Sequence, residues 1–570
     1  MTILGLNYSL DSAAALLENG RVLAAAAEER FNRVKHTGAF PSGALDYCLR
    51  SQGMESIHDV DAVAFFWNPG THLEHFDSHR STQWRHHSEF LTAVPNYLLN
   101  KIPGDRHAGT VDYTHQRFEF KDENENPLDI YYFDHHLCHA ASCFYLSPWE
   151  EAAILTVDGF GERTSALMAK GEGTTITPLK RIEFPHSLGS FYGALTQYLG
   201  FRPNRDEGKV MALAAFGETT FVQPMRELFS LKDGGSFELD LSCFSFFQQS
   251  RRRYSEKFEE IFGSEREPGE EISQRHRDVA RAGQAALETV LVHLAGWLKS
   301  ETGLKRLCMA GGVALNSVAN SSIQDEAGFA ETFIVPAAGD DGTSLGAALY
   351  LVHGLQGKPR EMVLDHSFWG PDFSDADIEG VLKASKLEAT APDDLAEAVA
   401  GLLAEGKFIG WFQGRMEFGP RALGARSILA DPRGKDIKDV LNDQVKHRES
   451  FRPFAPAVLE DRCGEYFKPD SPSPFMLKVQ QTRSEMQSDI PAVIHADGTA
   501  RAQTIGADSG APKFRRLIES FDRLTGIPMI LNTSFNVQGE PIVCTPQDAL
   551  RCFYTTGLDA LALGKFLLVK

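Results

Sequence analysis

The stretch Tyr131–Gly161, YYFDHHLCHAASCFYLSPWEEAAILTVDGFG, carries the chemistry around which the fold is built. His135 and His139 are four residues apart, so on a helix both imidazoles lie on one face. The apolar run at 152–157 then predicts a strand that delivers Asp158 into a glycine-flanked turn. Two imidazoles and a carboxylate suit iron, zinc or manganese, although such a histidine pair can also simply pack against a helix. Because an Asp-Gly-x-Gly turn suits nucleotide phosphates and their metal, the turn favours a metal site.

The pattern of strands and turns that begins near residue 152 also occurs at the N-terminus. Residues 2–30 predict three strands, with a hairpin turn at Asn19-Gly20. The later copy reads AILTVDG, TSALMAKGEG and TITPLKRIEF. This internal duplication is the layout of the actin, hexokinase and heat-shock ATPase superfold, in which nucleotide lies between two α/β halves.

Bulk composition restricts the class of protein. A chain of 570 residues is expected to form two to four domains, and its net charge of −20 weighs against a nucleic-acid binder. No signal peptide and no apolar stretch of about 18 residues occurs, so a soluble cytoplasmic protein without membrane contact is expected. Reduced thiols fit this setting, because the cysteines are scattered without a CxxC pair, at positions 48, 138, 143, 243, 308, 463, 544 and 552.

Two further turns before helices suggest anion binding. A strand at 306–310 ends in Gly311-Gly312, and the helix after it has Asn316 in its first turns. A glycine pair before a helix lets an anion approach free backbone amides. Gly208-Lys209 could bring a lysine to a phosphate in the same way.

The other turn is Asp340-Asp341-Gly342, where two adjacent aspartates precede a predicted helix of small residues. Asp341 is therefore a candidate for the fourth metal ligand or for holding a magnesium-bound water. Gly342–Gly346 also matches the Gly-x-Ser-x-Gly elbow of hydrolases, but the acidic pair would oppose an oxyanion near Ser344.

The C-terminal part, after a Pro- and Gly-containing linker near 355–375, is cationic in its motifs. Arginines placed among Gly, Pro and Phe differ from a solvated charged face, and guanidinium forks bind phosphate in a bidentate way. We predict a pocket for a small phosphorylated substrate and a nucleoside triphosphate; structural salt bridges are the alternative. The residues concerned are Arg415, Arg421, Arg426, Lys446, Arg448, Arg452 and Arg501, with Asn532, Thr533 and Ser534 at the end of an apolar strand.

Taken in order, these motifs resemble the O-carbamoyltransferases of antibiotic biosynthesis and nodulation. The resemblance spans almost the whole chain, through GLNYSLDSAAAL, EERFNRVKH, HHLCHAAS, VDGFGE, EGKVMALAAFG, MAGGVALN, GDDGTSLGAA, GRMEFGPRALGARS, FRPFAP, TARAQT and LNTSFN. So many ordered motifs make a chance match negligible.

The resemblance implies two domains. Residues 1–355 would be an actin-like domain similar to tRNA threonylcarbamoyl-transfer proteins, and residues 356–570 a YrdC-like α/β domain. The YrdC-like domain would make carbamoyl adenylate from carbamoyl phosphate and ATP with Mg²⁺. The first domain would then transfer the carbamoyl group to a hydroxyl of a small-molecule acceptor, assisted by Fe²⁺ or a similar ion.

The resemblance also assigns site residues by motif. The implied metal ligands are His135, His139, Asp158 and Asp341, with Asp340 competing for the last position. The implied contacts to carbamoyl phosphate and ATP are Arg421, Lys446, Arg452, Arg501, Asn532 and Ser534. Gly311, Gly312 and Asn316, together with Lys209 from its glycine-flanked position, form the expected adenylate site of the first domain.

One position departs from the family pattern. The family usually reads Asn-x-x-His-Asp near its start, whereas Asn7 is followed here by Tyr-Ser-Leu-Asp. Leu10 cannot move protons, so the general base is left to Asp11 or His136.

Three other functions remain alternatives at this point. A small-molecule kinase of the same superfold leaves the arginine-rich part without a purpose. A tRNA-modifying threonylcarbamoyl-type transferase conflicts with the acidic net charge. A non-catalytic scaffold conflicts with the intact metal motif. The acceptor and the assembly, including a homodimer, are left open.

Overall fold

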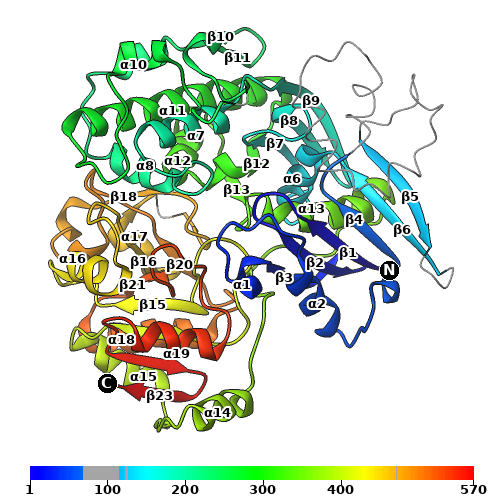
Figure 1. The fold of residues 1–570 in the computed structure, drawn as a ribbon. Helices are drawn as coiled ribbons and strands as arrows, with labels where there is room; N and C mark the ends of the chain where they lie inside the picture. The colour runs from blue at the N-terminus through cyan, green and yellow to red at the C-terminus, as the bar shows by residue number, and fades with distance from the viewer. Residues whose placement is uncertain (69–113, 122–125, 249, 470) are drawn as a thin grey trace.

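The computed structural model describes residues 1–68, 114–121, 126–248, 250–469 and 471–570 (Figure 1). The N-terminal part, drawn from blue to green, and the C-terminal part, drawn from yellow to red, lie side by side in Figure 1. Each part has its own sheets and its own buried apolar cluster, and a further cluster includes residues of both parts.

The first sheet has the order β3-β2-β1-β4-β6-β5. Its first three strands form an antiparallel meander, and β4 and β6 then run parallel to β1. The alternating small and apolar residues of these strands are almost completely buried. The bounds are β1 Thr2–Asn7, β2 Ala13–Glu18, β3 Arg21–Ala27, β4 Ala62–Phe65, β5 His115–Lys121 and β6 Pro127–Phe133.

The second sheet repeats this plan in the order β13-β12-β7-β8-β9. Again three strands form an antiparallel meander, and two later strands run parallel to the first. The repeated order and directions confirm the predicted duplication of an actin-like α/β half. The bounds are β7 Glu151–Val157, β8 Thr164–Glu172, β9 Thr175–Glu183, β12 Arg306–Ala310 and β13 Glu331–Ile334.

Two helices, α6 (His135–Phe144) and α13 (Asp341–Leu349), lie between the sheets. α6 packs on β7 and β12, α13 packs on β1 and β2, and the helices contact each other. Their contact needs glycine, because a Cβ on Gly346 would lie 1.8 Å from the carbonyl oxygen of Cys138. The N-termini of both helices are thereby held at the junction of the two halves.

A helical layer covers the second half. The longest of these helices is α11 (Gln274–Thr302), and α12 (Ser317–Glu326) begins with Asn316 as its N-cap. The charge-rich stretch at 251–276 is exposed only in part, because α10 (Glu256–Phe262) buries two phenylalanines. The other bounds are α1 Glu29–Asn32, α2 Ser42–Arg50, α7 Leu188–Tyr198, α8 Glu207–Ala214, α9 Val222–Arg226, β10 Phe229–Lys232 and β11 Ser236–Leu239.

The C-terminal part is built on a mixed seven-stranded sheet of order β20-β16-β21-β15-β14-β22-β23. α15 and α18 pack against each other over one core, and α19 borders the other. This part is α/β as predicted, while its YrdC likeness and the boundary at residue 355 stay predictions. The bounds are α14 Asp375–Ala384, α15 Leu395–Ala404, β14 Ile409–Phe412, β15 Arg426–Ala430, α16 Ile437–Val440, β16 Ala455–Leu459, α17 Cys463–Tyr466, β17 Phe467–Lys468, β18 Gln480–Thr482, β19 Thr499–Ala500, β20 Gln503–Ile505, α18 Pro512–Thr525, β21 Met529–Ser534, α19 Pro546–Tyr554, β22 Ala560–Leu563 and β23 Phe566–Val569.

Two bulk expectations can be compared with the fold. All eight cysteines are buried and free, as expected for reduced thiols. Within the described part of the chain, no helix combines the length and apolar character that a membrane crossing requires.

Candidate functional site

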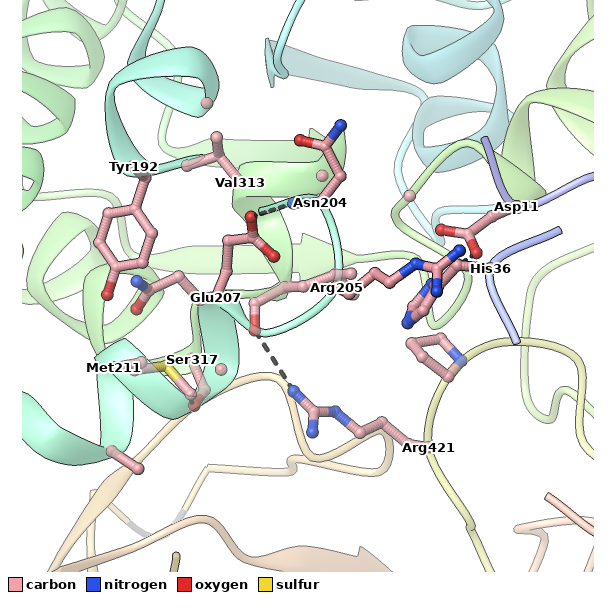
Figure 2. A pocket seen from close by; sticks show the side chains of 18 of the residues that line it. Asp11, His36, Tyr192, Asn204, Arg205, Glu207, Met211, Val313, Ser317 and Arg421 are labelled. Carbon is pink, nitrogen blue, oxygen red and sulfur yellow. Dashed lines mark hydrogen bonds and ion pairs between the residues drawn. The ribbon is translucent and has the colours of Figure 1, made fainter. Parts of the chain in front are cut away.

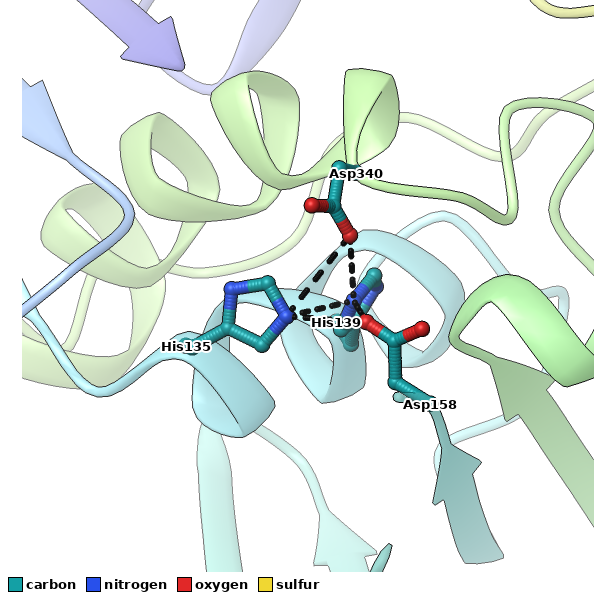
Figure 3. A group of neighbouring side chains, drawn as sticks. All are labelled: His135, His139, Asp158 and Asp340. Carbon is teal, nitrogen blue, oxygen red and sulfur yellow. Dashed lines mark hydrogen bonds and ion pairs between the residues drawn. The ribbon is translucent and has the colours of Figure 1, made fainter. Parts of the chain in front are cut away.

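Four side chains from three elements converge where the two halves meet (Figure 3). His135 and His139 come from α6, Asp158 follows β7, and Asp340 precedes α13. The Nε2 atoms of the two histidines are 3.1 Å apart, and Oδ2 of Asp158 lies 3.1 and 3.4 Å from them. Oδ1 of Asp340 lies 3.7 Å from each Nε2. Both imidazoles and both carboxylates therefore point at one centre.

Local structure positions each of these groups. The side chain of Asp134 accepts a hydrogen bond from the Leu137 amide, so the helix begins at His135 and both histidines face the same way. The Gly312 amide donates to Oδ1 of Asp158 over 3.2 Å. A Cβ at residue 312 would lie 2.8 Å from that oxygen, so a larger residue there would displace the Asp158 carboxylate.

The electrostatics of this group fit a bound cation. Burial opposes ionisation of Asp158, but the two histidines outweigh it and hold the pKa of Asp158 well below its usual range. Burial and the charge of Asp158 raise the pKa of Asp340 well above its usual range. The ligand atoms of all four residues lie within 4.8 Å of one another. Two nitrogen and two oxygen donors in this arrangement fit a borderline divalent metal.

Asp341, predicted as the fourth ligand, does not belong to this group. Its Oδ1 accepts a hydrogen bond from the Gly342 amide, and burial raises its pKa to about 7. Asp340 faces the histidines instead, because successive residues at a helix start point in different directions. Ser344 donates to the Asp341 carbonyl and is buried, so the hydrolase-like motif has no accessible nucleophile.

His136, predicted as a candidate base, is a structural residue. Its Nδ1 lies 2.7 Å from the Thr156 hydroxyl and its Nε2 lies 2.9 Å from the Thr164 carbonyl. Burial, with the charges of its two histidine neighbours, lowers its pKa well below the usual range. Both ring nitrogens are occupied, so His136 has no free position for a substrate proton.

Replacing His136 with alanine should therefore reduce stability more than catalysis. We expect the free energy of unfolding to fall by about 3 kcal/mol, because a cavity forms and two buried polar partners lose their hydrogen bonds. Urea unfolding followed by circular dichroism measures this change. His58→Ala, at an exposed histidine, is the control and should change it by less than about 0.5 kcal/mol. A His136→Ala protein of wild-type stability that fails in carbamoyl transfer would contradict the structural role.

A single cavity of about 1130 Å³ joins this group to the C-terminal part. Asp158, Asp340 and Gly312 line it on one side, and Arg421 and Arg501 on the other. Arg421 reaches from the C-terminal part across the cavity, where its guanidinium donates to the Leu315 carbonyl of the N-terminal part over 3.4 Å (Figure 2).

The C-terminal wall of the cavity is a cluster of four arginines: Arg421, Arg448, Arg452 and Arg501. Burial and the charge of Arg452 lower the pKa of Arg421 to about 10. Burial, then Arg421 and its neighbours, lowers the pKa of Arg501 well below its usual range. The Nε atoms of Arg421 and Arg501 are buried and have no partner among the described residues. These cations are therefore prepared to receive anionic groups.

Polar groups from the end of β21 complete this wall. Asn532 donates to the Ala422 carbonyl and to Gln503, while its Oδ1 has no partner among the described residues. Ser534 also lines the cavity. Lys446, predicted as a substrate contact, does not line it; its Nζ donates to the backbone carbonyls of Ser534 and Asn536 at 2.7 and 2.8 Å. Lys446 therefore stabilises the end of β21 without contributing to the cavity surface.

The predicted adenylate residues are only partly brought together. Gly311 has a φ of 94°, and a Cβ there would lie 2.2 Å from the Val157 carbonyl oxygen. Gly312 and Asn316 line the cavity, although the Asn316 amide is engaged with the Ala319 amide and Gln284. Lys209 is not a lining residue. It forms ion pairs with Asp206 at 3.2 Å and Glu449 at 3.0 Å, so it joins the two parts of the chain.

Two histidines are among the lining residues that no sequence motif marked as site residues. His36 lies beside Asp11, and His495 lies near Arg501. Burial and Arg501 lower the pKa of His495 to about 4, which keeps it neutral. The dense charges at 28–36 are also typical of a solvated helix end, so the motif EERFNRVKH of the family resemblance is the sequence signal that includes His36.

Comparison with known proteins identifies the family. The model described as carbamoyltransferase N-terminus matches residues 2–349, and the model described as carbamoyltransferase C-terminus matches residues 400–570. This chain belongs to the carbamoyltransferase family. It is accordingly a carbamoyltransferase, as the motif resemblance predicted.

Full-length relatives agree with the family assignment. The carbamoyltransferase is 40% identical to the uncharacterized protein sll1178 of Synechocystis, over 100% of this chain and 96% of the relative. It is 39% identical to the nodulation protein NolNO of Sinorhizobium fredii, over 98% of this chain and 79% of the relative.

Among solved structures, component A of the Acidaminococcus fermentans (R)-2-hydroxyglutaryl-CoA dehydratase aligns with 62% of this chain and 99% of its own, with 14% identity and a TM-score of 0.34.

Proposed function

We propose that this carbamoyltransferase is an ATP-dependent O-carbamoyltransferase that works in two steps. Carbamoyl phosphate and ATP react at the arginine cluster to form carbamoyl adenylate. The carbamoyl group then passes to a hydroxyl of a small-molecule acceptor near the His135–Asp340 group. The observation that carries the proposal is the single cavity that connects four arginines with two histidines and two carboxylates.

The arginine cluster suits the first step. Carbamoyl phosphate and ATP are both polyanions, and half-buried guanidinium groups with unpartnered N–H groups supply fixed donors for them. The adenylate provides AMP as a leaving group for a weakly electrophilic carbamoyl carbon. Because the cavity continues into the N-terminal part, this intermediate would move without release into bulk water.

The second step would use the residues at the junction of the two halves. His135, His139, Asp158 and Asp340 would hold a divalent metal such as Fe²⁺, which supplies Lewis-acid polarisation when bound. Gly312 keeps Asp158 in place through its amide. Phe246 and Arg253 line the cavity, so the region 220–280 contributes to the space available for the acceptor.

Incubation with ATP, carbamoyl phosphate and Mg²⁺ in the absence of acceptor tests the first step. We expect pyrophosphate and a carbamoyl-AMP species, detected by mass spectrometry, and both should depend on carbamoyl phosphate. ADP formed without carbamoyl phosphate would contradict the proposal and favour a kinase. Binding of tRNA in a gel-shift assay would favour a threonylcarbamoyl-type transferase.

A further inference from the structure

An aspartate–histidine pair, Asp11 and His36, lies in the cavity and is separate from the group formed by His135, His139, Asp158 and Asp340. His36 Nδ1 lies 2.7 Å from Oδ1 of Asp11, and both side chains line the cavity (Figure 2). A carboxylate can only accept this hydrogen bond, so Nδ1 carries the proton and donates it. In the neutral ring the lone pair is then on Nε2, for which the described residues offer no hydrogen-bond partner.

The backbone holds both residues of the pair in a costly conformation. Asp11 has a φ of 54° and His36 a φ of 55°, the left-handed region that non-glycine residues rarely adopt. Such positions cost of order 1 kcal/mol or more each and collect at functional sites. The two strained residues lie on different loops, and their side chains meet. A solvated helix end would need neither feature.

The loop that carries Asp11 is tied to the loop that carries Asp340. The buried Asn7 amide donates to the carbonyl of Asp340 at 2.6 Å and to the carbonyl of Asp11 at 3.2 Å. Ser9 Oγ donates to Oδ2 of Asp340 over 3.1 Å. These hydrogen bonds therefore fix the position of the aspartate–histidine pair relative to the Asp340 carboxylate, and all three side chains line the same cavity.

We propose that His36 is the general base that deprotonates the acceptor hydroxyl, and that Asp11 is the positioning residue that orients it. The acceptor proton moves to Nε2 of His36 while the acceptor oxygen bonds to the carbamoyl carbon. The bond from that carbon to the phosphoryl oxygen breaks, and AMP leaves with the electron pair. This inference rests on the proposed function, because the adenylate is the group donor.

The surroundings set the direction of the pH dependence. The charged groups that face His36 are Asp11, Glu29 of α1 and the adjacent Lys35. Burial would lower the pKa of His36, but the hydrogen bond and charge of Asp11, with Glu29, raise it above its usual value. A base must be neutral, so the transfer rate should rise with pH through the pKa of His36. Asp11→Asn removes the raising charge and should move that limb to lower pH.

The experiment separates the two half-reactions in the full-length protein. Exchange of labelled pyrophosphate into ATP, dependent on carbamoyl phosphate, reports adenylate formation. AMP production with water and with glycerol as probe acceptors reports carbamoyl transfer. For His36→Gln and His36→Asn we expect wild-type exchange and at least a hundredfold slower AMP production, the usual scale of general-base catalysis. Asparagine tolerates the left-handed backbone, so it guards against loss of folding.

The outcomes are distinct. His58→Gln, at an exposed histidine, should leave both rates unchanged. Equal AMP production by His36→Gln and wild type, or a pH limb that Asp11→Asn does not move, would overturn the assignment of His36. Absence of exchange in the wild type would instead contradict the proposed function itself, and the assignment of His36 with it.

Discussion

Arg421→Ala should lower the rate of carbamoyl adenylate formation by two to three orders of magnitude. Removing one cation from a buried charge contact costs on the order of 3–4 kcal/mol, which corresponds to a factor of roughly 100–1,000. The loss should appear in carbamoyl phosphate-dependent pyrophosphate exchange. Arg516→Ala is the matched control and should leave exchange unchanged, because it removes an exposed guanidinium of α18 that pairs with Asp394 at the start of α15.

The same substitution should not destabilise the protein without substrate. Arg421 is surrounded by other cations, and burial and Arg452 depress its pKa to about 10. A base with a depressed pKa is disfavoured in its charged form in the folded state, so at neutral pH its charge opposes folding. The melting temperature of Arg421→Ala should therefore equal or exceed that of the wild type. A lower melting temperature together with normal exchange would show that Arg421 is a structural residue.

His139→Ala and Asp340→Asn should uncouple the two half-reactions. Each removes a donor that points at the common centre, so bound metal should fall below stoichiometry and carbamoyl transfer should drop at least a hundredfold. Pyrophosphate exchange should persist, because the arginine cluster is intact. Metal content is measured by inductively coupled plasma mass spectrometry, and carbamoyl-AMP is followed directly.

Asp341→Asn supplies the internal control for this prediction. Asp341 is adjacent to Asp340 in the chain but bonds to the Gly342 amide, so this variant should retain its metal. Loss of metal in Asp341→Asn with retention in Asp340→Asn would reverse the assignment made from the geometry.

The local patterns of the sequence were sufficient for the architecture and for most of the site. Two meanders with the same turn signals predicted the duplicated sheets, because hairpin turns and buried strands depend on neighbouring residues. The spacing of His135 and His139 predicted a shared helix face for the same reason. The arginines among Gly, Pro and Phe predicted a cationic pocket, and four of them line the cavity. Arg415 and Arg426 do not, because their guanidinium groups donate to backbone carbonyls instead.

Only the tertiary structure decided which neighbours face the cavity. Asp340 and Asp341 are consecutive residues at a helix start, so their side chains point in different directions. Only Asp340 of the two faces His135 and His139, whereas Asp341 accepts a hydrogen bond from the Gly342 amide. His136 is adjacent to His135, yet its ring hydrogen-bonds within the core.

The orientations of the other side chains depend on contacts between segments that are distant in the sequence. Lys209 pairs with Glu449 of the C-terminal part, and Lys446 supports the end of β21. His36 meets Asp11 because two loops adopt left-handed backbone at the same place. The sequence by itself thus determined the elements and their chemical types, since these follow from short-range periodicity. The direction of each side chain was decided by packing between residues far apart in the chain, which no local pattern encodes.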